Sequence, residues 1–372
     1  MKRLVKFLGG MFASVFALTA CDNWLETEIM HTTDLINSNK DEAYYERLRK
    51  YKDSEHQVAF GWFGNWTGTG ASYENSLKGL PDSVDFVSLW GNWKNPSEAM
   101  LNDLRFVQKK KNTKALVCFL VLDIGDQITP PMPKEEAELG TTQQAWRHKF
   151  WGWDHTLENR LIAVEKYANA ICDTIDKYEY DGFDMDAEPT LQHPFHTDKE
   201  LWSDGKQVIE RFITTLSKRI GPKSGSGKLF VIDGEPHTVP DTLFSHFDYL
   251  ILQTYTTYFK QDNNRLNERF EKQYDAFKNV ASAEEIAKKI IICEDFEKYA
   301  KGGGADFGLP DGNTTNSLSG FAMWNPVFNG KQYAKGGVGT FHMEYEYKAN
   351  PQSTVTYPAL RKAIQIQNPS NK

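Results

Sequence analysis

Residues 181–188 (DGFDMDAE) constrain the fold more than any other stretch of this chain. In a β-strand the side chains alternate between two faces, so Asp184, Asp186 and Glu188 would all point to the same side. Burying three acids costs free energy unless they share protons, accept hydrogen bonds or take part in chemistry. The pattern therefore indicates a strand with a functional face, because packing alone would not favour it.

Two other interpretations of this stretch are an exposed acidic loop and a calcium-binding loop. Phe183 and Met185 alternate with the acids, and no further oxygen ligands follow at calcium-loop spacing, so a strand is favoured. If the acids face the interior of a parallel barrel, Glu188 lies at the carboxyl-terminal mouth, where such barrels place their active sites. Acids roughly 7 Å apart along a strand raise one another's pKa, so the outermost can stay protonated and act as a general acid.

Strand-like and helix-like segments alternate along the rest of the chain, which favours a parallel α/β fold. Mainly apolar runs predict seven more strands, at residues 56–66, 84–93, 115–123, 229–233, 247–255, 289–295 and 336–347. Helical spacing predicts helices over 96–111, up to residue 178, and over 206–219 and 357–367. Eight strands fit a closed (β/α)₈ TIM barrel with the acid strand fourth. Residues 301–319, rich in Gly, Asn and Ser, predict a long exposed loop.

The amino-terminal segment predicts export and lipidation. Residues 1–20 combine an early basic cluster with a short apolar run, and small residues precede Cys21, as in a bacterial lipoprotein signal peptide. A transmembrane helix is the alternative, but the run is shorter than the roughly 20 residues that span a bilayer. We expect lipid on Cys21, a polar tether over residues 21–50 and a single barrel domain over residues 51–372.

Composition excludes several classes of partner and site. The net charge is −7 and no basic patch is interleaved with aromatic residues, so nucleic acid is a disfavoured partner. Cys118, Cys172 and Cys293 lie in apolar patterns without the spacing of a metal site, so we expect buried free thiols. We predict no metal and no cofactor, and we expect a monomer.

Several predicted strands and loops end in polar or aromatic residues that could converge at one mouth. A hydrogen-bonded structural role is the alternative for each of them. Gln253 and Tyr255 rank highest because they are two apart and share a strand face. The other candidates for substrate binding are Asp123, Asp233, Glu294, Trp90 and Trp324.

The acid stretch resembles the D-x-x-D-x-D-x-E signature of glycoside hydrolase family 18, and all four acids of that signature are present in residues 181–188. The segment Gln253-Thr254-Tyr255 is similar to the endo-β-N-acetylglucosaminidase branch, whereas chitinases of the family tend to carry Met-x-Tyr-Asp. Residues 336–339 (GGVG) also resemble that branch, and the third strand lacks the Ser-x-Gly-Gly of many chitinases.

The resemblance implies a retaining mechanism in which the acetamido group of the substrate is the nucleophile. Glu188 would protonate the glycosidic oxygen, Asp186 would stabilise the acetamido N–H, Asp184 would share a proton with Asp186, and Tyr255 would orient the acetamido oxygen. Asp181 lies an odd number of residues from Asp184, so we expect it to be structural.

The function implied by the resemblance is hydrolysis of the GlcNAc-β1,4-GlcNAc bond in the core of N-linked glycans. Chitinase activity is the alternative within enzymes, and a non-catalytic surface glycan-binding lipoprotein is the alternative from another class. We expect a lipid anchor in the bacterial outer membrane, facing the cell surface, with N-glycans on glycoproteins as partners. The preferred class of glycan antenna does not follow from the sequence.

Overall fold

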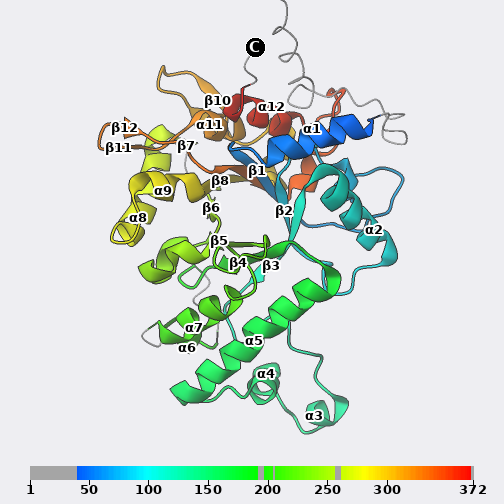
Figure 1. The fold of residues 1–372 in the computed structure, drawn as a ribbon, viewed down its shortest axis with the longest axis vertical. Helices are drawn as coiled ribbons and strands as arrows, with labels where there is room; N and C mark the ends of the chain where they lie inside the picture. The colour runs from blue at the N-terminus through cyan, green and yellow to red at the C-terminus, as the bar shows by residue number, and fades with distance from the viewer. Residues whose placement is uncertain (1–39, 192–196, 204–205, 256–260, 370–372) are drawn as a thin grey trace, which may run out of the picture.

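The computed structural model describes residues 40–191, 197–203, 206–255 and 261–369. Its centre is a closed barrel of parallel strands, which confirms the predicted (β/α)₈ fold (Figure 1). The strands follow the order β1 (Val58–Phe63), β2 (Phe86–Leu89), β3 (Lys114–Leu120), β4 (Gly182–Ala187), β5 (Leu229–Gly234), β6 (Leu250–Gln253), β8 (Ile290–Asp295) and β13 (Gly337–Phe341), which pairs back with β1. The acid stretch forms the fourth strand, as predicted.

Helices cover the outside of the barrel. They are α1 (Glu42–Lys52), α2 (Glu98–Phe106), α3 (Lys134–Glu138), α4 (Gln143–Trp151), α5 (Leu157–Tyr178), α6 (Glu200–Ser203), α7 (Gln207–Leu216), α8 (Asn263–Phe277), α9 (Ala283–Lys289), α10 (Phe296–Tyr299), α11 (Ser317–Met323) and α12 (Pro358–Gln367). Short strands outside the barrel are β7 (Gln261–Asp262), β9 (Asp306–Gly308), β10 (Thr314–Asn316), β11 (Val327–Phe328) and β12 (Lys331–Gln332). None of the described helices is both long and apolar enough to cross a membrane.

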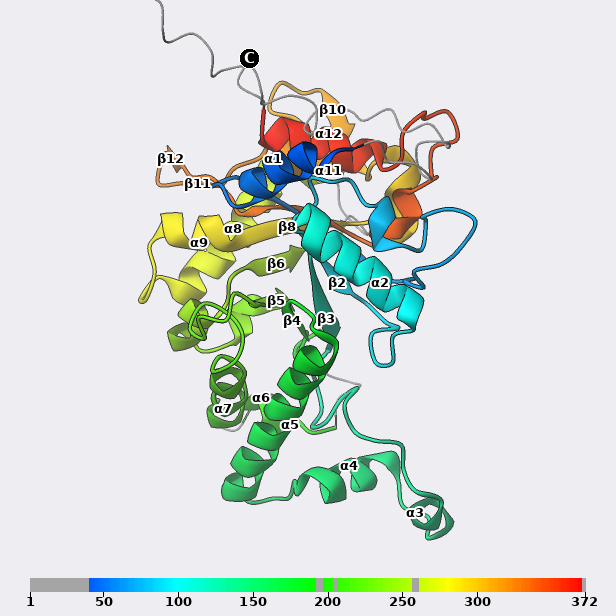
Figure 2. The ribbon, with the colours of Figure 1, turned by 45° about the vertical axis from the view of Figure 1, so that its right-hand side comes forward.

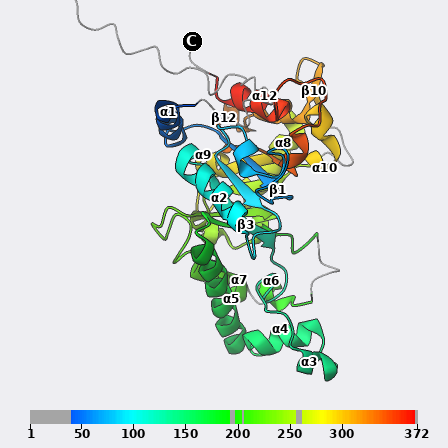
Figure 3. The same cartoon turned by 90° about the vertical axis from the view of Figure 1, so that its right-hand side faces the viewer.

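The long helix α5 leads the chain into the acid strand. It begins where the Thr156 side chain accepts a hydrogen bond from the backbone N–H of Asn159, and it ends at Glu179 in the left-handed conformation. Its buried stripe includes Tyr167, whose ring stacks on Phe212 of α7 with centroids 5.2 Å apart. The segment after β3 carries α3 and α4 away from the barrel to the far end of α5 (Figures 2 and 3).

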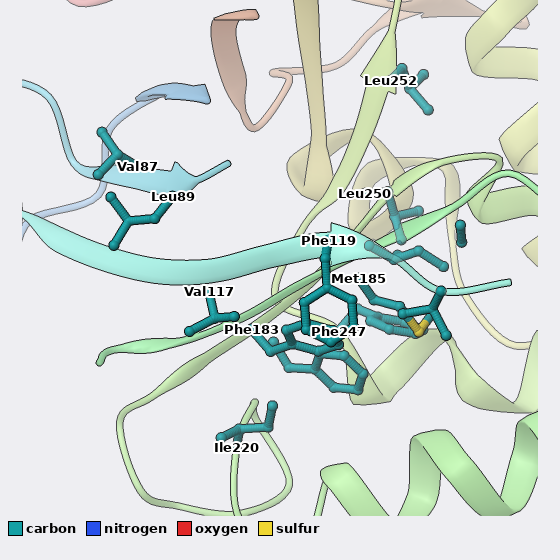
Figure 4. Close-up of a cluster of buried hydrophobic side chains, with 14 of the residues drawn as sticks. Val87, Leu89, Val117, Phe119, Phe183, Met185, Ile220, Phe247, Leu250 and Leu252 are labelled. Atoms are coloured by element: carbon teal, nitrogen blue, oxygen red, sulfur yellow. The ribbon is translucent and has the colours of Figure 1, made fainter. Parts of the chain in front are cut away.

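The core has two layers, because both faces of each barrel strand are covered. Outward-facing side chains of neighbouring strands meet the helices and loops, as the close-up shows for Val87, Leu89, Val117, Phe119, Phe183, Met185, Ile220, Phe247, Leu250 and Leu252 (Figure 4). The inward-facing side chains form a second cluster of Val58, Phe60, Trp62, Phe86, Leu116, Cys118, Val231, Ile251, Ile291 and Cys293. Each buried large apolar side chain contributes about 1.5–3 kcal/mol. The acids of β4 face this inner layer.

Two predicted boundaries differ from the structure. Residues 42–50 belong to α1 and are not part of a polar tether, because Tyr45 and Leu48 are buried there. The stretch 301–319 is not one exposed loop: it contains the β9–β10 hairpin and the start of α11, with Phe307 and Leu318 buried. The predicted signal peptide and Cys21 lie outside the described residues.

Candidate active site

Strand β4 brings two of its acids into the interior of the barrel and the third to its mouth. Asp184 and Asp186 point inward and are buried, and Glu188 follows the last strand residue with 9% of its surface exposed. The strand begins at Gly182, whose φ is +147°, and a Cβ there would lie 1.9 Å from the carbonyl oxygen of Leu229. Glycine therefore allows β4 to lie close to β5 at the start of the acid strand.

Asp181 has the structural role predicted for it. One of its carboxylate oxygens accepts hydrogen bonds from the backbone N–H of Ala115, at 2.8 Å, and from the side-chain amide of Gln108, at 2.7 Å. These contacts connect the start of β4 to β3 and to the turn that follows α2. Asp181 therefore fixes the position of the strand and stays away from the inner face.

Asp184 is the deepest acid of the strand. The hydroxyl of Ser88 donates a hydrogen bond to Asp184 Oδ2 at 2.5 Å, and the side chains of Trp62 and Cys118 lie close to this carboxyl group. Burial outweighs these contacts and raises the pKa of Asp184 to about 6. The carboxyl group can therefore exchange a proton near neutral pH.

Asp186 lies between Asp184 and Glu188 along the strand, and 6% of its surface is exposed. Burial raises the pKa of Asp186 well above its ordinary value, and the negative charge of Glu188 raises it further. Asp186 therefore favours its protonated form in the free protein.

Asp233 of β5 joins the acids of β4 inside the barrel. It is fully buried, its Cα pairs with that of Asp186 across the two strands, and it contacts both Asp184 and Asp186. The side-chain amide of Gln253, at the end of β6, donates a hydrogen bond to Asp233 Oδ1 at 2.7 Å. Asp233 was predicted to contact substrate at the mouth, but it is fully buried among the acids, beside Asp186 in the strand register.

Tyr255 follows the end of β6, two residues after Gln253, and lies near this cluster. Its ring stacks on Phe341, at the end of β13, with centroids 5.8 Å apart and planes 29° apart. Burial is the largest factor that raises the pKa of Tyr255, and the charges of Asp233 and Asp186 contribute. These acids are therefore close to the phenol, which stays protonated and can donate a hydrogen bond.

Aromatic rings form one side of the mouth. Phe341 contacts Trp62, Trp90 and Tyr255, with ring centroids 6.1, 6.3 and 5.8 Å apart. Trp90, a predicted substrate-binding residue, follows the end of β2 and is half-buried here. Such a group of rings at the top of a barrel can hold the apolar face of a sugar. Phe341 was not predicted from the sequence. The feature that could have identified it is its position as the last residue of β13.

At the end of β8, Asp295 and not the predicted Glu294 lies on the inward face. Glu294 was the candidate, but it points outward, where its Oε2 accepts a hydrogen bond of 2.5 Å from Ser317 of α11. Asp295 shares the face of Cys293 and Ile291, which belong to the inner cluster, and its charge acts on Tyr255. Asp295 is therefore the acid of this strand that faces the mouth.

Asp123 has a structural role in place of the predicted contact with substrate. Its Oδ1 accepts hydrogen bonds from the backbone N–H groups of Thr197 and Asp198, at 2.7 and 2.8 Å. Its Oδ2 accepts one from Arg147 of α4 at 2.9 Å. Both oxygens therefore have partners within the protein, and Asp123 connects the segment after β3 to the segment before α6.

Trp324 lies at the opposite end of the barrel from the acids. It is 2% exposed within the outer core, and its indole N–H donates to Asn267 of α8 at 3.1 Å. Its carbonyl accepts a hydrogen bond from Lys335, which immediately precedes Gly336 and the amino-terminal end of β13. The prediction that Trp324 binds substrate is therefore wrong, because the residue packs as core.

Glu235 is a residue near the site that was not predicted from the sequence. It follows β5 on the inward face, and its Oε2 accepts hydrogen bonds from the backbone N–H groups of Thr190 and Leu191 at 2.7 and 3.1 Å. Its own N–H donates to the carbonyl of Ala187 at 2.7 Å. Glu235 therefore fixes the backbone on both sides of Glu188. The sequence feature that could have identified Glu235 is its two-residue spacing from Asp233.

Cys118, Asp184 and Asp233 could in principle hold a metal ion, since their ligand atoms lie within 4.8 Å of one another. Burial raises the pKa of all three groups, most strongly for the thiol and Asp233. A cation would have to displace these protons in an interior lined by apolar side chains. Proton sharing among the acids accounts for the cluster more directly.

Comparison with known proteins identifies the family. The profile described as glycoside hydrolase family 18, BT1044-like, matches residues 26–366. The chain is 25% identical over 221 residues to endo-beta-N-acetylglucosaminidase F2 of Elizabethkingia meningoseptica, covering 56% of this chain and 53% of that protein. It therefore spans about half the length of that relative.

Two solved structures are similar over most of their length. One is BT1044, in selenomethionine form and with one Glu→Gln replacement, at 33% identity and a TM-score of 0.73, covering 92% of this chain and 97% of that one. The other is an endo-beta-N-acetylglucosaminidase from Cordyceps militaris, at 20% identity and a TM-score of 0.59, covering 90% and 98%. The similarity to the Cordyceps militaris structure shows a shared fold only. With its acid strand and barrel in place, the chain belongs to glycoside hydrolase family 18.

Proposed function

We propose that this glycosidase is an endo-β-N-acetylglucosaminidase that cleaves the GlcNAc-β1,4-GlcNAc bond in the core of N-linked glycans. The observation that carries the proposal is the pair Gln253 and Tyr255, of which Gln253 donates to Asp233 and Tyr255 lies close to Asp186 and Asp233 and stacks on Phe341. This Gln-x-Tyr segment is the feature that resembles the endoglycosidase branch. The partial match to endo-beta-N-acetylglucosaminidase F2 supports the same substrate class.

The acids of β4 suit hydrolysis with the substrate's acetamido group as nucleophile. Glu188, at the mouth, gives its proton to the glycosidic oxygen as the bond to C1 breaks. The acetamido oxygen attacks C1 and forms an oxazolinium ion, while Asp186 accepts a hydrogen bond from the acetamido N–H and stabilises the positive charge. Water then opens the ring, and Glu188 takes back a proton, with net retention at C1.

Tyr255 and Asp184 support the two reacting groups. The phenol donates a hydrogen bond to the acetamido oxygen and holds it for attack, which lowers the entropic part of the barrier. Asp184 takes up the proton that Asp186 releases when the acetamido N–H arrives. A solved relative from Cordyceps militaris, with a bound fucosyl-N-acetylglucosamine-Asn, carries replacements of an Asp and a Glu two positions apart. That spacing equals the spacing of Asp186 and Glu188.

A direct competition tests the substrate class. An asparagine-linked glycopeptide and a chitin hexamer are offered together, and kcat/KM is measured for each. We expect cleavage of the glycopeptide between the two core GlcNAc residues, leaving one of them on asparagine, at a kcat/KM above that for chitin. A higher kcat/KM for the chitin hexamer would assign the enzyme to the chitinases.

The lipid anchor is a second proposal, which rests on the sequence before Cys21. We infer that Cys21 carries lipid and holds the enzyme on the outer membrane facing the surrounding medium. Growth with a labelled fatty acid should label the wild-type protein and leave Cys21→Ser unlabelled. Protease added to intact cells should remove the wild-type protein if it faces outward. An unlabelled wild-type protein would contradict the anchor.

A further inference from the structure

Three buried carboxylate oxygens inside the barrel receive no hydrogen bond from an N–H or O–H group of the described residues. They are Asp184 Oδ1, Asp186 Oδ1 and Asp233 Oδ2. Asp233 is in contact with both acids of β4. Two ionised carboxylates in contact repel, and a buried acceptor without a donor costs about 1–3 kcal/mol. A proton on one of the three acids turns one of these oxygens into a donor to another and removes part of the repulsion.

The partners of the three acids show which of them holds that proton. Asp184 Oδ2 accepts a hydrogen bond of 2.5 Å from the hydroxyl of Ser88. Donors of this kind stabilise an ionised carboxylate. Asp233 receives the amide of Gln253 on Oδ1, which leaves Oδ2 as the oxygen that can carry a hydrogen toward β4. Asp233 is also the one of the three acids that contacts both of the others, so a hydrogen on its Oδ2 can serve either of them.

We propose that Asp233 is a positioning residue of this glycosidase: a neutral carboxylic acid that donates a hydrogen bond from Oδ2 to the acids of β4 and so controls how they share their remaining proton. The proposal rests on the proposed function for its kinetic consequences. Asp233 keeps its proton throughout. When the acetamido N–H of the substrate reaches Asp186, the shared proton passes from Asp186 to Asp184, and no proton is exchanged with solvent.

The groups around Asp233 are compatible with a neutral acid. It is faced by Cys118 of β3, Asp184 and Asp186 of β4, Gln253 of β6, Tyr255 just after that strand and Cys293 of β8, with Glu188 beyond Asp186. Among the described residues, no Lys, Arg or His forms an ion pair with any of the three aspartates. Burial raises the pKa of Asp233 well above its ordinary value, and the charges of Asp186 and Asp184 add to that effect.

Two substitutions of Asp233 test whether it acts as a neutral hydrogen-bond donor or as a charged group. The amide of D233N can accept from Gln253 through its oxygen and donate to β4 through its nitrogen, so D233N should retain most of the kcat. D233A removes the donor and leaves the acids of β4 without a fixed geometry, and kcat should fall by about 10²-fold. If Asp233 worked as an anion, D233N would lose as much activity as D233A.

The pH profile of D233A gives a readout that a purely structural role would not move. Loss of a donor to the ionised acids raises the pKa of the Asp184–Asp186 pair, so the acidic limb of kcat/KM should move to higher pH. Loss of a negative charge would lower that pKa, and the limb would move to lower pH. A shift to lower pH, or no shift, would overturn the proposal.

A spectroscopic arm does not depend on activity and so separates this proposal from the proposed function. The infrared band of protonated carboxylic acids is compared at pH 7 between wild type and D233N, with thermal unfolding as a check of folding. We expect the difference spectrum to show the loss of one protonated acid in D233N. A difference confined to ionised carboxylate bands would contradict the proposal even if no glycan is cleaved.

If D233N fails to fold, a second variant can still test the proposal. Gln253→Met removes the amide that donates to Asp233 Oδ1, and it leaves the acid itself in place. The protonated-acid band should then move to higher frequency, because its carbonyl has lost a hydrogen bond. A band that stays unchanged would mean that the protonated acid is not the neighbour of Gln253, and the proposal would fail.

Discussion

Ser88 donates a hydrogen bond of 2.5 Å to Asp184 inside the barrel, between two strands that are separated by β3. Both residues are fully buried. The contact fixes Oδ2 of the deepest acid and leaves Oδ1 to the other acids of the cluster. A hydroxyl in an otherwise apolar strand, β2, thus sets the geometry of the acid strand.

Replacing Ser88 tests this relationship. Ser88→Ala removes the donor and leaves a buried carboxylate oxygen without a partner, so the protein should lose about 1–3 kcal/mol of stability and a large part of kcat. Ser88→Thr keeps the hydroxyl and serves as the matched control. Chemical denaturation and steady-state kinetics measure the two effects. Equal losses in both variants would show that space in the barrel matters more than the hydrogen bond.

Gly182→Ala should destabilise the acid strand. Its Cβ would lie 1.9 Å from the carbonyl oxygen of Leu229, so β4 and β5 would have to separate. Gly140→Ala is the control, because Gly140 also has a positive φ (+78°) but a Cβ there would meet no atom within 4 Å. The control should cost about 1–2 kcal/mol from backbone strain alone. Thermal unfolding of both variants compares them, and similar losses would contradict the importance of the close approach.

The buried acids predict a stability that falls as pH rises. The pKa of Asp184 is raised to about 6 in the folded protein, so folding favours its protonated form. That stability is fully present below the ordinary pKa of an aspartate, about 4, and is lost as pH rises through about 6. D184N cannot ionise, so its free energy of unfolding should fall less than that of wild type between pH 4 and 7. Parallel curves from urea titrations would contradict the shift.

Two tryptophans should respond differently to substitution. Trp90→Ala removes a half-buried ring of the mouth and should raise KM for glycan without a large loss of stability. Trp324→Phe removes an indole from the outer core and its hydrogen bond to Asn267, so it should lower stability while KM stays unchanged. A raised KM for Trp324→Phe, measured beside its unfolding temperature, would restore that residue to the binding site.

The sequence predicted the barrel and the acids of β4 because both depend on local patterns. Alternation along a strand decides which of Asp184, Asp186 and Glu188 share a face, whatever surrounds the strand. The seven mainly apolar runs likewise predict strands without knowledge of their neighbours. The inward position of Gln253 and its relation to Tyr255 followed from the same two-residue spacing.

Other features depended on contacts that a single sequence does not show. The run before Glu294 is apolar on both faces, so it does not reveal which of Glu294 and Asp295 points inward. Asp123 was expected at the mouth because it ends a strand, but Thr197 and Arg147, distant in sequence, occupy its oxygens. The burial of Phe307 was not predicted, because residues 301–319 are rich in Gly and suggested an exposed loop. In each case tertiary packing decides the role.

The most direct test of the central claim is mass spectrometry of glycans released from two glycoproteins, one with high-mannose and one with complex N-glycans. Wild type and Glu188→Gln are compared, with thermal unfolding to show that the variant folds. We predict that wild type releases glycans ending in a single reducing GlcNAc from at least one glycoprotein, while Glu188→Gln loses about 10²–10⁴-fold in rate. Release by Glu188→Gln at the wild-type rate, or no release from either glycoprotein by wild type, would contradict the account.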